Sequence, residues 1–156
     1  MTRFKGFTLI ELMVTIAVLA IAIAIAAPNF SKMIVRNQAE SQRSALVGAF
    51  NLARSEAIKR AKDIQVVPIN SSWTNGWQVK DGTEVLREFP ALKNASVTSA
   101  VTSVTYNSRG RLTGTGVNAS TQYAFAYRVG NDHCKVERDI NINVLGRVAI
   151  RPRVCS

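Results

Sequence analysis

The apolar residues of this chain are distributed unevenly, and the longest run lies near the N-terminus. Residues 7–27 contain one charged side chain, Glu11, in an otherwise mostly apolar stretch. About 20 apolar residues in a helix cross the hydrocarbon core of a bilayer, so this run predicts a transmembrane helix over residues 7–28. Arg3 and Lys5 precede the run. Basic residues before a span favour a cytoplasmic N-terminus, which places the residues after the span on the other side of the membrane, outside the cytoplasm.

From residue 29 to about residue 63, apolar side chains recur at three- and four-residue spacings, which predicts an amphipathic helix. The stripe is rich in alanine, which suits close packing against a sheet. We expect this stretch and the apolar run to form one long helix, kinked at Pro28 because proline lacks a backbone donor and its ring clashes with the preceding turn. The stripe consists of Leu46, Ala49, Phe50, Ala53, Ala57 and Ile58.

After residue 63 the pattern changes to short segments rich in Val, Ile, Thr and Tyr, separated by glycine-containing turns, which predicts β-strands. In one of them Ile140, Ile142 and Val144 alternate with polar residues and should face the core. The expected fold class is α+β, with one long N-terminal helix, transmembrane half plus amphipathic half, packed on an antiparallel β-sheet. The predicted strands cover residues 64–69, 77–80, 97–106, 123–129, 139–145 and 147–150.

The inventory of reactive side chains limits the chemistry. The chain has one histidine, His133, and two cysteines, Cys134 and Cys155. A zinc site with three or four such ligands would use all of them. The phosphate-binding loop, the nucleophile elbow and the zinc-protease helix motif are all missing from the sequence. We therefore expect a protein that catalyses nothing and holds no metal and no cofactor, with His133 in a loop.

Glu11 distinguishes three interpretations of the N-terminal run. A cleaved secretory signal fits poorly, because proline directly follows the small residues Ala26 and Ala27. A plain single-pass anchor leaves the carboxylate unexplained, since an acid in a membrane helix is costly and usually has a partner or a function. In the third interpretation the chain is cut between Gly6 and Phe7. The new amine on Phe7 would then pair with Glu11 of a neighbouring copy, or of the same chain, and set an axial register.

The segment from Gly6 to Leu12, Gly-Phe-Thr-Leu-Ile-Glu-Leu, resembles the type IV prepilin signature. In that family a prepilin peptidase cuts after the glycine and methylates the new phenylalanine amine, and the glutamate acts in filament assembly. Pro28 also fits the family. The resemblance implies a leader over residues 1–6, a transmembrane and assembly helix over 7–28, and a periplasmic globular domain over 29–156. It also implies a bacterial inner-membrane location before transfer to the pilus, with other major and minor pilins as partners.

Four further segments resemble the GspH/FimT/FimU group of minor pilins and pseudopilins. The segments are Ala53–Ile58, Trp73–Trp77, Tyr106–Arg111 and Gly146–Val148, the last before Cys155. The second of these, with the pattern Trp-x-x-Gly-Trp, is expected to form a hairpin whose aromatic rings cover the sheet rather than a site that stacks a ligand.

Cys134 and Cys155 flank the last two predicted strands. A domain outside the cytoplasm lies in oxidising surroundings, so we expect a Cys134–Cys155 disulfide. It would close a loop of about 20 residues and stabilise the fold by roughly 3 kcal/mol in the chain-entropy model.

The chain carries 20 basic and 10 acidic side chains, a formal net charge of +10. Two segments, residues 89–131 and 140–156, contain basic residues and no acid. Such segments favour a polyanion partner, because arginine binds phosphate bidentately and opposing charge is sparse. The arginines proposed to contact the polyanion are Arg147, Arg151 and Arg153, extended by Arg109 and Arg111 if the fold brings them near.

The resemblance adds a specific hypothesis about this charge. FimT-like minor pilins of naturally transformable bacteria are DNA receptors that use a C-terminal Gly-Arg-x-Arg segment. Here Ala149 replaces the second arginine of that segment. The favoured hypothesis is a minor type IV pilin that captures extracellular double-stranded DNA for natural transformation. The alternatives are a structural minor pilin that primes assembly at the pilus tip, and a GspH-like pseudopilin of a type II secretion system. Lys32 and Arg36 would contact inner-membrane lipid headgroups.

Overall fold

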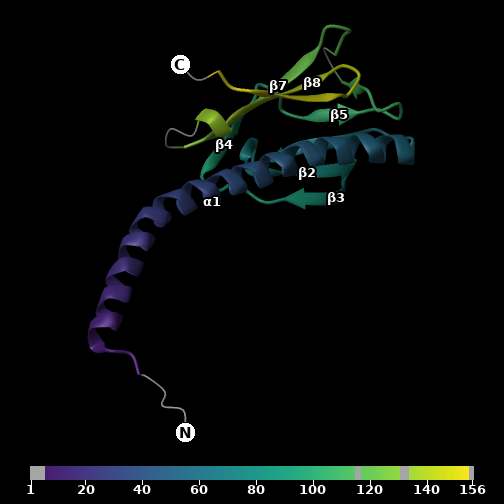
Figure 1. Ribbon diagram of the computed structural model, residues 1–156. Coiled ribbons are helices and arrows are strands. Elements are labelled where there is room, and N and C mark those ends of the chain that lie inside the picture. Colours follow the sequence, from purple (N-terminus) through teal and green to yellow (C-terminus); the bar gives the residue numbers. More distant parts are fainter. Residues whose placement is uncertain (1–5, 115–116, 131–133, 155–156) are drawn as a thin grey trace. The chain divides into compact units, whose positions relative to one another are not determined.

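The computed structural model describes residues 6–114, 117–130 and 134–154, without the side chains of residues 25–29 and 32. The chain divides into two units, residues 1–38 and 39–156. A single helix, α1 (Leu9–Arg60), runs through both units and continues through Pro28 (Figure 1). The expectation of one long helix is therefore confirmed, and a kink at Pro28 stays a prediction. Within the described residues, no helix is both long enough and apolar enough to cross a membrane.

Helix α1 ends in a tight motif built on a left-handed residue. Ala61 has a φ of 53°, the amide of Lys62 donates to the carbonyl of Ala57 at 3.2 Å, and the amide of Ala61 donates to the carbonyl of Ile58 at 3.4 Å. These two bonds form a Schellman motif, which satisfies carbonyls that the last turn would otherwise leave unpaired. The motif turns the chain directly into the first strand.

Two antiparallel sheets follow the helix. The first has the order β3-β2-β1-β5-β6 and the second has the order β4-β7-β8-β9. The first sheet comprises β1 (Ile64–Ile69), β2 (Ser72–Asp81), β3 (Glu84–Phe89), β5 (Val104–Tyr106) and β6 (Leu112–Thr113). The second comprises β4 (Ala95–Thr98), β7 (Gln122–Val129), β8 (Arg138–Asn143) and β9 (Val148–Pro152), with a short 3-10 helix, η1 (Cys134–Val136), before β8.

One hydrophobic core joins the second half of α1 to both sheets. The ring of Phe50 on α1 lies 6.0 Å from Trp73 on β2 and 4.9 Å from Phe125 on β7, between ring centroids. The predicted helix stripe is buried except for Ile58, which is 52% exposed. In the part of the chain that the structure describes, all of the buried apolar residues fall between residues 39 and 142, so the second unit carries its own core.

The fold class is confirmed as α+β with a helix packed on antiparallel strands, but the segment predicted as one strand over residues 97–106 divides between the two sheets. β4 pairs with β7, whereas β5 pairs with β1 and β6. The break is held by side chains: Ser99 Oγ donates to the carbonyl of Ala124 at 2.7 Å, and Trp73 Nε1 donates to the carbonyl of Val101 at 2.8 Å. These bonds turn residues 99–103 away from the line of β4.

The remaining strand predictions succeeded to different degrees. The strands predicted over residues 64–69 and 123–129 match β1 and β7 closely, whereas β3 and the two-residue β6 were missed. The Trp-x-x-Gly-Trp segment lies inside β2, at a shift in the register with β1: Pro68 pairs with Trp77, whereas Ile69 pairs with Ser72. Trp73 and Trp77 are buried, which agrees with rings that cover the sheet. Ile140 and Ile142 face the core as predicted, and Val144 is half-buried beyond the end of β8.

Candidate functional site

Two turns of the globular unit share one sequence pattern, Asn-x-x-Gly-Arg, and one set of hydrogen bonds. In the first turn, residues 107–111, the Asn107 amide donates to the Arg111 carbonyl at 2.9 Å, and the Arg111 amide donates to Asn107 Oδ1 at 3.1 Å. In the second turn, residues 143–147, the equivalent distances between Asn143 and Arg147 are 3.1 and 3.0 Å. In both turns the glycine amide donates to the asparagine carbonyl at 2.8 Å. Each turn therefore ends on an arginine whose backbone amide is bonded to the asparagine side chain, while its guanidinium is not part of the turn.

The two turns lie directly against each other. A Cβ atom built on Gly146 would stand 2.2 Å from the carbonyl oxygen of Gly110, so only glycine at position 146 permits this approach. Both glycines also have left-handed backbones, with φ of 70° at Gly110 and 75° at Gly146. The Leu112 amide donates to the Val144 carbonyl at 3.0 Å just beyond the turns. We call residues 107–111 and 143–147 together the paired turns.

A helix side chain contacts both turns at their point of approach. Arg54 of α1 is half-buried, and its Nε donates to the Gly110 carbonyl at 2.9 Å. The same Nε would lie 3.2 Å from a Cβ on Gly146. Tyr106, which precedes the first turn, is buried; burial raises the pKa of its hydroxyl, and the positive charge of Arg54 partly opposes that shift. Arg54 thus packs beneath the paired turns and is only partly exposed to solvent.

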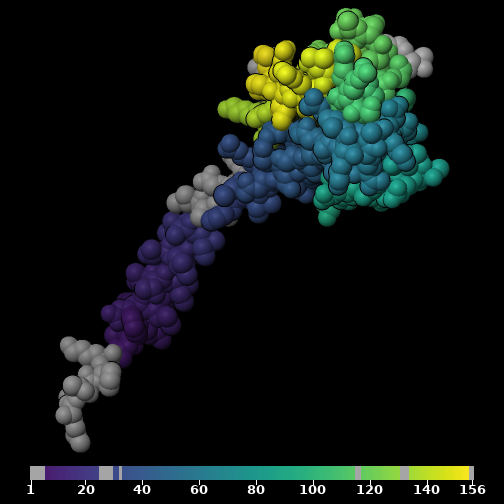
Figure 2. All heavy atoms as spheres, turned by 90° about the vertical axis from the view of Figure 1, so that its right-hand side faces the viewer, coloured from purple at the N-terminus to yellow at the C-terminus, as the bar shows by residue number. Residues whose placement is uncertain are grey.

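Three of the predicted arginines lie on the paired turns. Arg109, Arg111 and Arg147 are all exposed. Among the described residues, none of the three forms an ion pair. One acid, Asp63, stands near the first turn in the strand register, because it precedes Ile64, the partner of Tyr106. In the space-filling view, yellow C-terminal residues reach the surface beside green residues from the middle of the chain (Figure 2). The paired turns therefore carry three exposed arginines and no acid of their own.

Arg153 is held elsewhere, by a buried carboxylate beside the C-terminal segment, although its own side chain is 46% exposed. It forms an ion pair with Glu137, whose side chain is buried, and its amide donates to the Glu137 carbonyl at 3.4 Å. Glu137 also accepts a hydrogen bond from the Val129 amide at 3.1 Å. Arg128 lies 3.8 Å from the same carboxylate. The chain therefore uses Arg153 to compensate a buried charge and to tie the C-terminal segment to β7 and β8.

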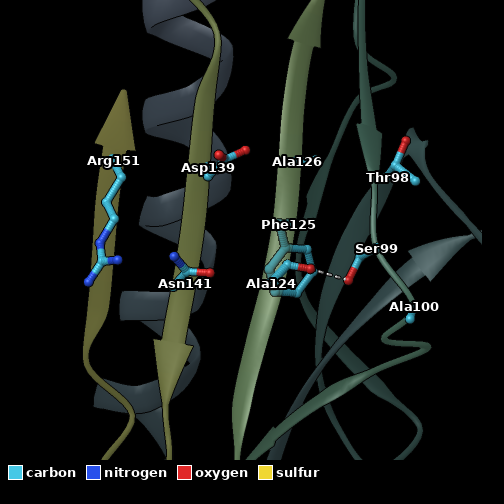
Figure 3. A pocket seen from close by; sticks show the side chains of 9 residues that line it. All are labelled: Thr98, Ser99, Ala100, Ala124, Phe125, Ala126, Asp139, Asn141 and Arg151. Carbon is cyan, nitrogen blue, oxygen red and sulfur yellow. Dashed lines mark hydrogen bonds between the residues drawn. The ribbon is translucent and has the colours of Figure 1, made fainter. Parts of the chain in front are cut away.

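Arg151 lies on the solvent face of the second sheet, beside an acid. It pairs in register with Asp139, which is itself held by Arg128 at 2.7 Å. A cavity of about 460 Å³ opens there, with Ala124 and Ala126 at its floor, and Figure 3 shows α1 behind the sheet on the opposite side. The nine lining residues are Thr98, Ser99, Ala100, Ala124, Phe125, Ala126, Asp139, Asn141 and Arg151. Arg151 and Arg153 therefore have different surroundings.

The N-terminal end of α1 forms a capping box. The amide and the hydroxyl of Thr8 each donate to Glu11 Oε2 at 2.9 Å, and the Glu11 amide donates to Thr8 Oγ1 at 3.3 Å. This is the reciprocal cap of a Thr-x-x-Glu sequence, a role for these residues that the predictions above did not include. Gly6 and Phe7 precede the helix and are exposed. The carboxylate of Glu11 is thus satisfied within its own chain.

Of the two cysteines and the single histidine, only Cys134 lies among the described residues. Cys134 is disulfide-bonded. Cys155 and His133 lie outside the described residues, so the predicted Cys134–Cys155 pairing stays a prediction. Across residues 6–114, 117–130 and 134–154, no three His, Cys, Asp or Glu side chains gather in a way that would hold a metal ion.

Two parts of the chain match known protein families. A family model described as Type II transport protein GspH matches residues 42–146, more than half of the chain. A second model, the prokaryotic N-terminal methylation motif, matches residues 1–27. The fold is similar to a crystal structure of the type IV minor pilin FimU of Pseudomonas aeruginosa (strain PAO1), with a TM-score of 0.62 and 21% identity over 75% of this chain and 90% of that one. A second crystal form of FimU gives a TM-score of 0.56 and 19% identity over 74% and 91%.

Proposed function

This chain belongs to the GspH family of type IV minor pilins and pseudopilins, and from that premise we propose that it is a minor pilin that binds the phosphate backbone of double-stranded DNA. The proposal has two parts, one for each unit of the chain. Residues 1–38 serve processing and assembly, and the globular unit carries the DNA contact. DNA captured in this way would serve natural transformation.

The N-terminal part of the proposal rests on the methylation motif over residues 1–27 and on the exposed peptide between Gly6 and Phe7. Prepilin peptidase would cut that bond and methylate Phe7, leaving residues 7–28 as a single span of the inner membrane and residues 29–156 in the periplasm. Glu11 caps its own helix until the new amine of Phe7 on a neighbouring pilin competes for its carboxylate. Pro28 would adjust the path of the helix during packing. Glu11→Ala should therefore insert normally and fail to enter filaments, and its normal incorporation would contradict this role.

The DNA part rests on one observation, the juxtaposition of the paired turns. They bring the segments that carry Arg109, Arg111 and Arg147 together although Arg147 is remote from the other two in sequence. A guanidinium donates two parallel hydrogen bonds to a phosphate and stays charged at every physiological pH. Several arginines on rigid turns can therefore contact successive phosphates without reading bases, which gives sequence-independent and salt-dependent binding.

Arg151 and Arg153 take secondary places in this proposal. Arg151 follows Arg147 by four residues of extended chain, about 13 Å along β9, which is within reach of the same duplex. The attraction between Arg151 and a phosphate is weakened by Asp139 beside it, because the carboxylate and the phosphate are both negative and repel each other. Arg153 contributes mainly through Glu137, by holding the C-terminal segment in place.

A structural minor pilin or a type II secretion pseudopilin is the second candidate. The observation that favours it is the family model, whose description names type II transport. In that case the arginines of the paired turns would meet acidic side chains on neighbouring subunits. Such a protein would enter its filament through the same N-terminal helix and would show no affinity for DNA.

The test is a titration of the full chain in nonionic detergent against labelled mixed-sequence duplex at several salt concentrations. The variant Arg109→Gln, Arg111→Gln, Arg147→Gln removes the proposed contacts. A matched variant, Lys80→Gln, Arg87→Gln, Lys93→Gln, removes the same charge from β2, β3 and the following loop. Each phosphate contact contributes about 0.9 to the slope of log affinity against log salt, so the first variant should lower the slope by about 2.7.

Two results would overturn the DNA proposal. The unaltered chain could show no binding at low salt, which would leave the structural candidate. Alternatively, the two triple variants could lose affinity equally, which would mean that net charge alone attracts the duplex. Loss confined to the paired-turn variant would support the proposal, and Arg151→Gln measured beside it would report how far the contact extends along β9.

A further inference from the structure

We infer that Arg54 is a positioning residue that joins the paired turns into one phosphate-binding unit. The inference rests on the proposed DNA binding and deepens it, since it concerns how the three exposed arginines are held. Arg54 itself is half-buried on α1 and gives its Nε hydrogen to the Gly110 carbonyl at 2.9 Å. It would act through Arg111 and Arg147 rather than by binding phosphate.

The contact lies where the two turns come closest to each other. A Cβ on Gly110 would stand 3.1 Å from Arg54 Nε and 3.2 Å from its Cγ. A Cβ on Gly146 would stand 3.2 Å from the same Nε and 2.2 Å from the Gly110 carbonyl oxygen. Arg54 therefore packs against both glycines at once, and the Gly110 carbonyl oxygen is close both to Arg54 Nε and to the Cβ position of Gly146.

The position of the Gly110 carbonyl influences the backbone positions from which the arginine side chains extend. Gly110 stands between Arg109 and Arg111, and its carbonyl belongs to the planar peptide unit that leads into Arg111. A hydrogen bond to that carbonyl fixes the orientation of the whole peptide plane. Because the same oxygen contacts Gly146, the residue before Arg147, its position also limits where the second turn can sit. One hydrogen bond thus constrains the backbone positions of Arg111 and Arg147, which belong to two separate turns.

Preorganisation gives this constraint a functional consequence. An arginine on a mobile loop must lose backbone and side-chain freedom when it binds, which reduces its affinity. Arginines on turns that are already held relative to each other lose less, and they can contact successive phosphates together. Without Arg54 we expect both turns to keep their own asparagine bonds and to lose their fixed relation. The result would be fewer simultaneous phosphate contacts at unchanged surface charge.

The experiment compares Arg54→Lys with Arg60→Lys in the full chain in nonionic detergent. Both substitutions keep the charge and remove an Nε donor on α1, because Arg60 Nε donates to Glu56 at 2.7 Å. Of the two arginines, Arg54 alone contacts the paired turns. We expect Arg54→Lys to weaken binding of the duplex at low salt by about tenfold and to lower the salt slope by about 1, as one lost phosphate contact does. Arg60→Lys should change neither quantity.

Melting temperatures of both variants separate positioning from stability. If Arg54→Lys stays folded at the assay temperature and keeps its affinity and salt slope, Arg54 only stabilises the fold and the inference is wrong. The DNA proposal is judged separately, by whether the unaltered chain binds and whether the paired-turn arginines carry that binding. The inference can therefore fail while the DNA proposal stands.

A second measurement decides the matter if Arg54→Lys does not stay folded. Arg111→Gln and Arg147→Gln are introduced singly and together into the otherwise unaltered chain. Residues that contact one run of phosphates as a unit give non-additive losses, whereas independent sites give additive ones. Non-additive loss supports one joined unit, and additive loss overturns it.

Discussion

Gly146→Ala is the substitution that tests the approach of the two turns most directly. An alanine at this position must adopt a φ near 75°, and its Cβ would stand 2.2 Å from the backbone oxygen of Gly110. That oxygen belongs to the main chain, so it cannot swing away as a flexible side chain would. The turns must separate, which strains or breaks the Arg54–Gly110 bond and the Leu112–Val144 bond.

The magnitude follows from these two effects. The left-handed backbone costs an alanine about 1 kcal/mol relative to glycine. Two hydrogen bonds each contribute about 1 kcal/mol net, so their weakening adds roughly 1–2 kcal/mol. Gly82→Ala provides the matched control, because Gly82 has a φ of 60° and nothing within 4 Å of its Cβ position. We expect losses of about 2–3 kcal/mol at Gly146 and about 1 kcal/mol at Gly82.

Urea unfolding of residues 29–156 measures both losses, since the core of the described chain lies entirely within this part. The quantity compared is the free energy of unfolding, with the denaturant slope checked to be equal in the two variants. Equal destabilisation by the two substitutions would refute the reasoning, because it would mean that the turns separate at no cost. A larger loss at Gly82 would refute it more strongly.

Three further predictions concern other parts of the globular unit. Ala61→Gly should raise the free energy of unfolding by about 0.5–1 kcal/mol, because glycine suits the φ of 53° that ends α1; an unchanged or lowered value in urea unfolding would contradict the Schellman motif. Arg153→Gln should destabilise the fold by about 1–3 kcal/mol, because it leaves the buried carboxylate of Glu137 poorly compensated, whereas Arg151→Gln should change stability by less than about 0.5 kcal/mol; similar melting temperatures for the two variants would show that the ion pair contributes little. Burial raises the pKa of Tyr127 to about 12, so its neutral form stabilises the fold below the ordinary tyrosine pKa near 10, and this contribution is lost as the pH rises from 10 through 12. Tyr127→Phe should therefore lose less stability between pH 9 and pH 11.5 than the unaltered chain, and identical losses would exclude Tyr127 as a cause of alkaline unfolding.

Local patterns in the sequence predicted the local structure well. The alanine-rich stripe on α1 identified five buried positions among its six members, because the helix period places such residues on one face whatever packs against it. Ile58 was the exception, since it lies in the last turn of α1 and remains half-exposed. The Thr8–Glu11 cap could also have been predicted from the sequence, because a capping box depends only on residues three apart.

Predictions that required a choice of partner strand were less successful. Residues 97–106 are rich in Val and Thr on both sides of Ser99 and Ala100, and this composition does not indicate that the chain changes sheets between Val97 and Val104. The change depends on Trp73 and on Ser99, which bond to backbone groups far away in the sequence. Strand propensity measures how well a residue suits a pleated surface and does not specify which strand lies beside it.

The five candidate arginines show most clearly what each level of description contributes. The sequence alone determined that the chain is basic, that two of its segments lack acids and that Asn-x-x-Gly-Arg occurs twice. Only the tertiary structure decided that the turns carrying Arg109, Arg111 and Arg147 lie against each other, because their approach depends on the close contact between Gly110 and Gly146. It also assigned Arg153 to Glu137, a buried acid that has to be compensated. Charge and turn geometry are properties of short segments, whereas the proximity of two turns is a property of the packing of helix α1 and both sheets around one core.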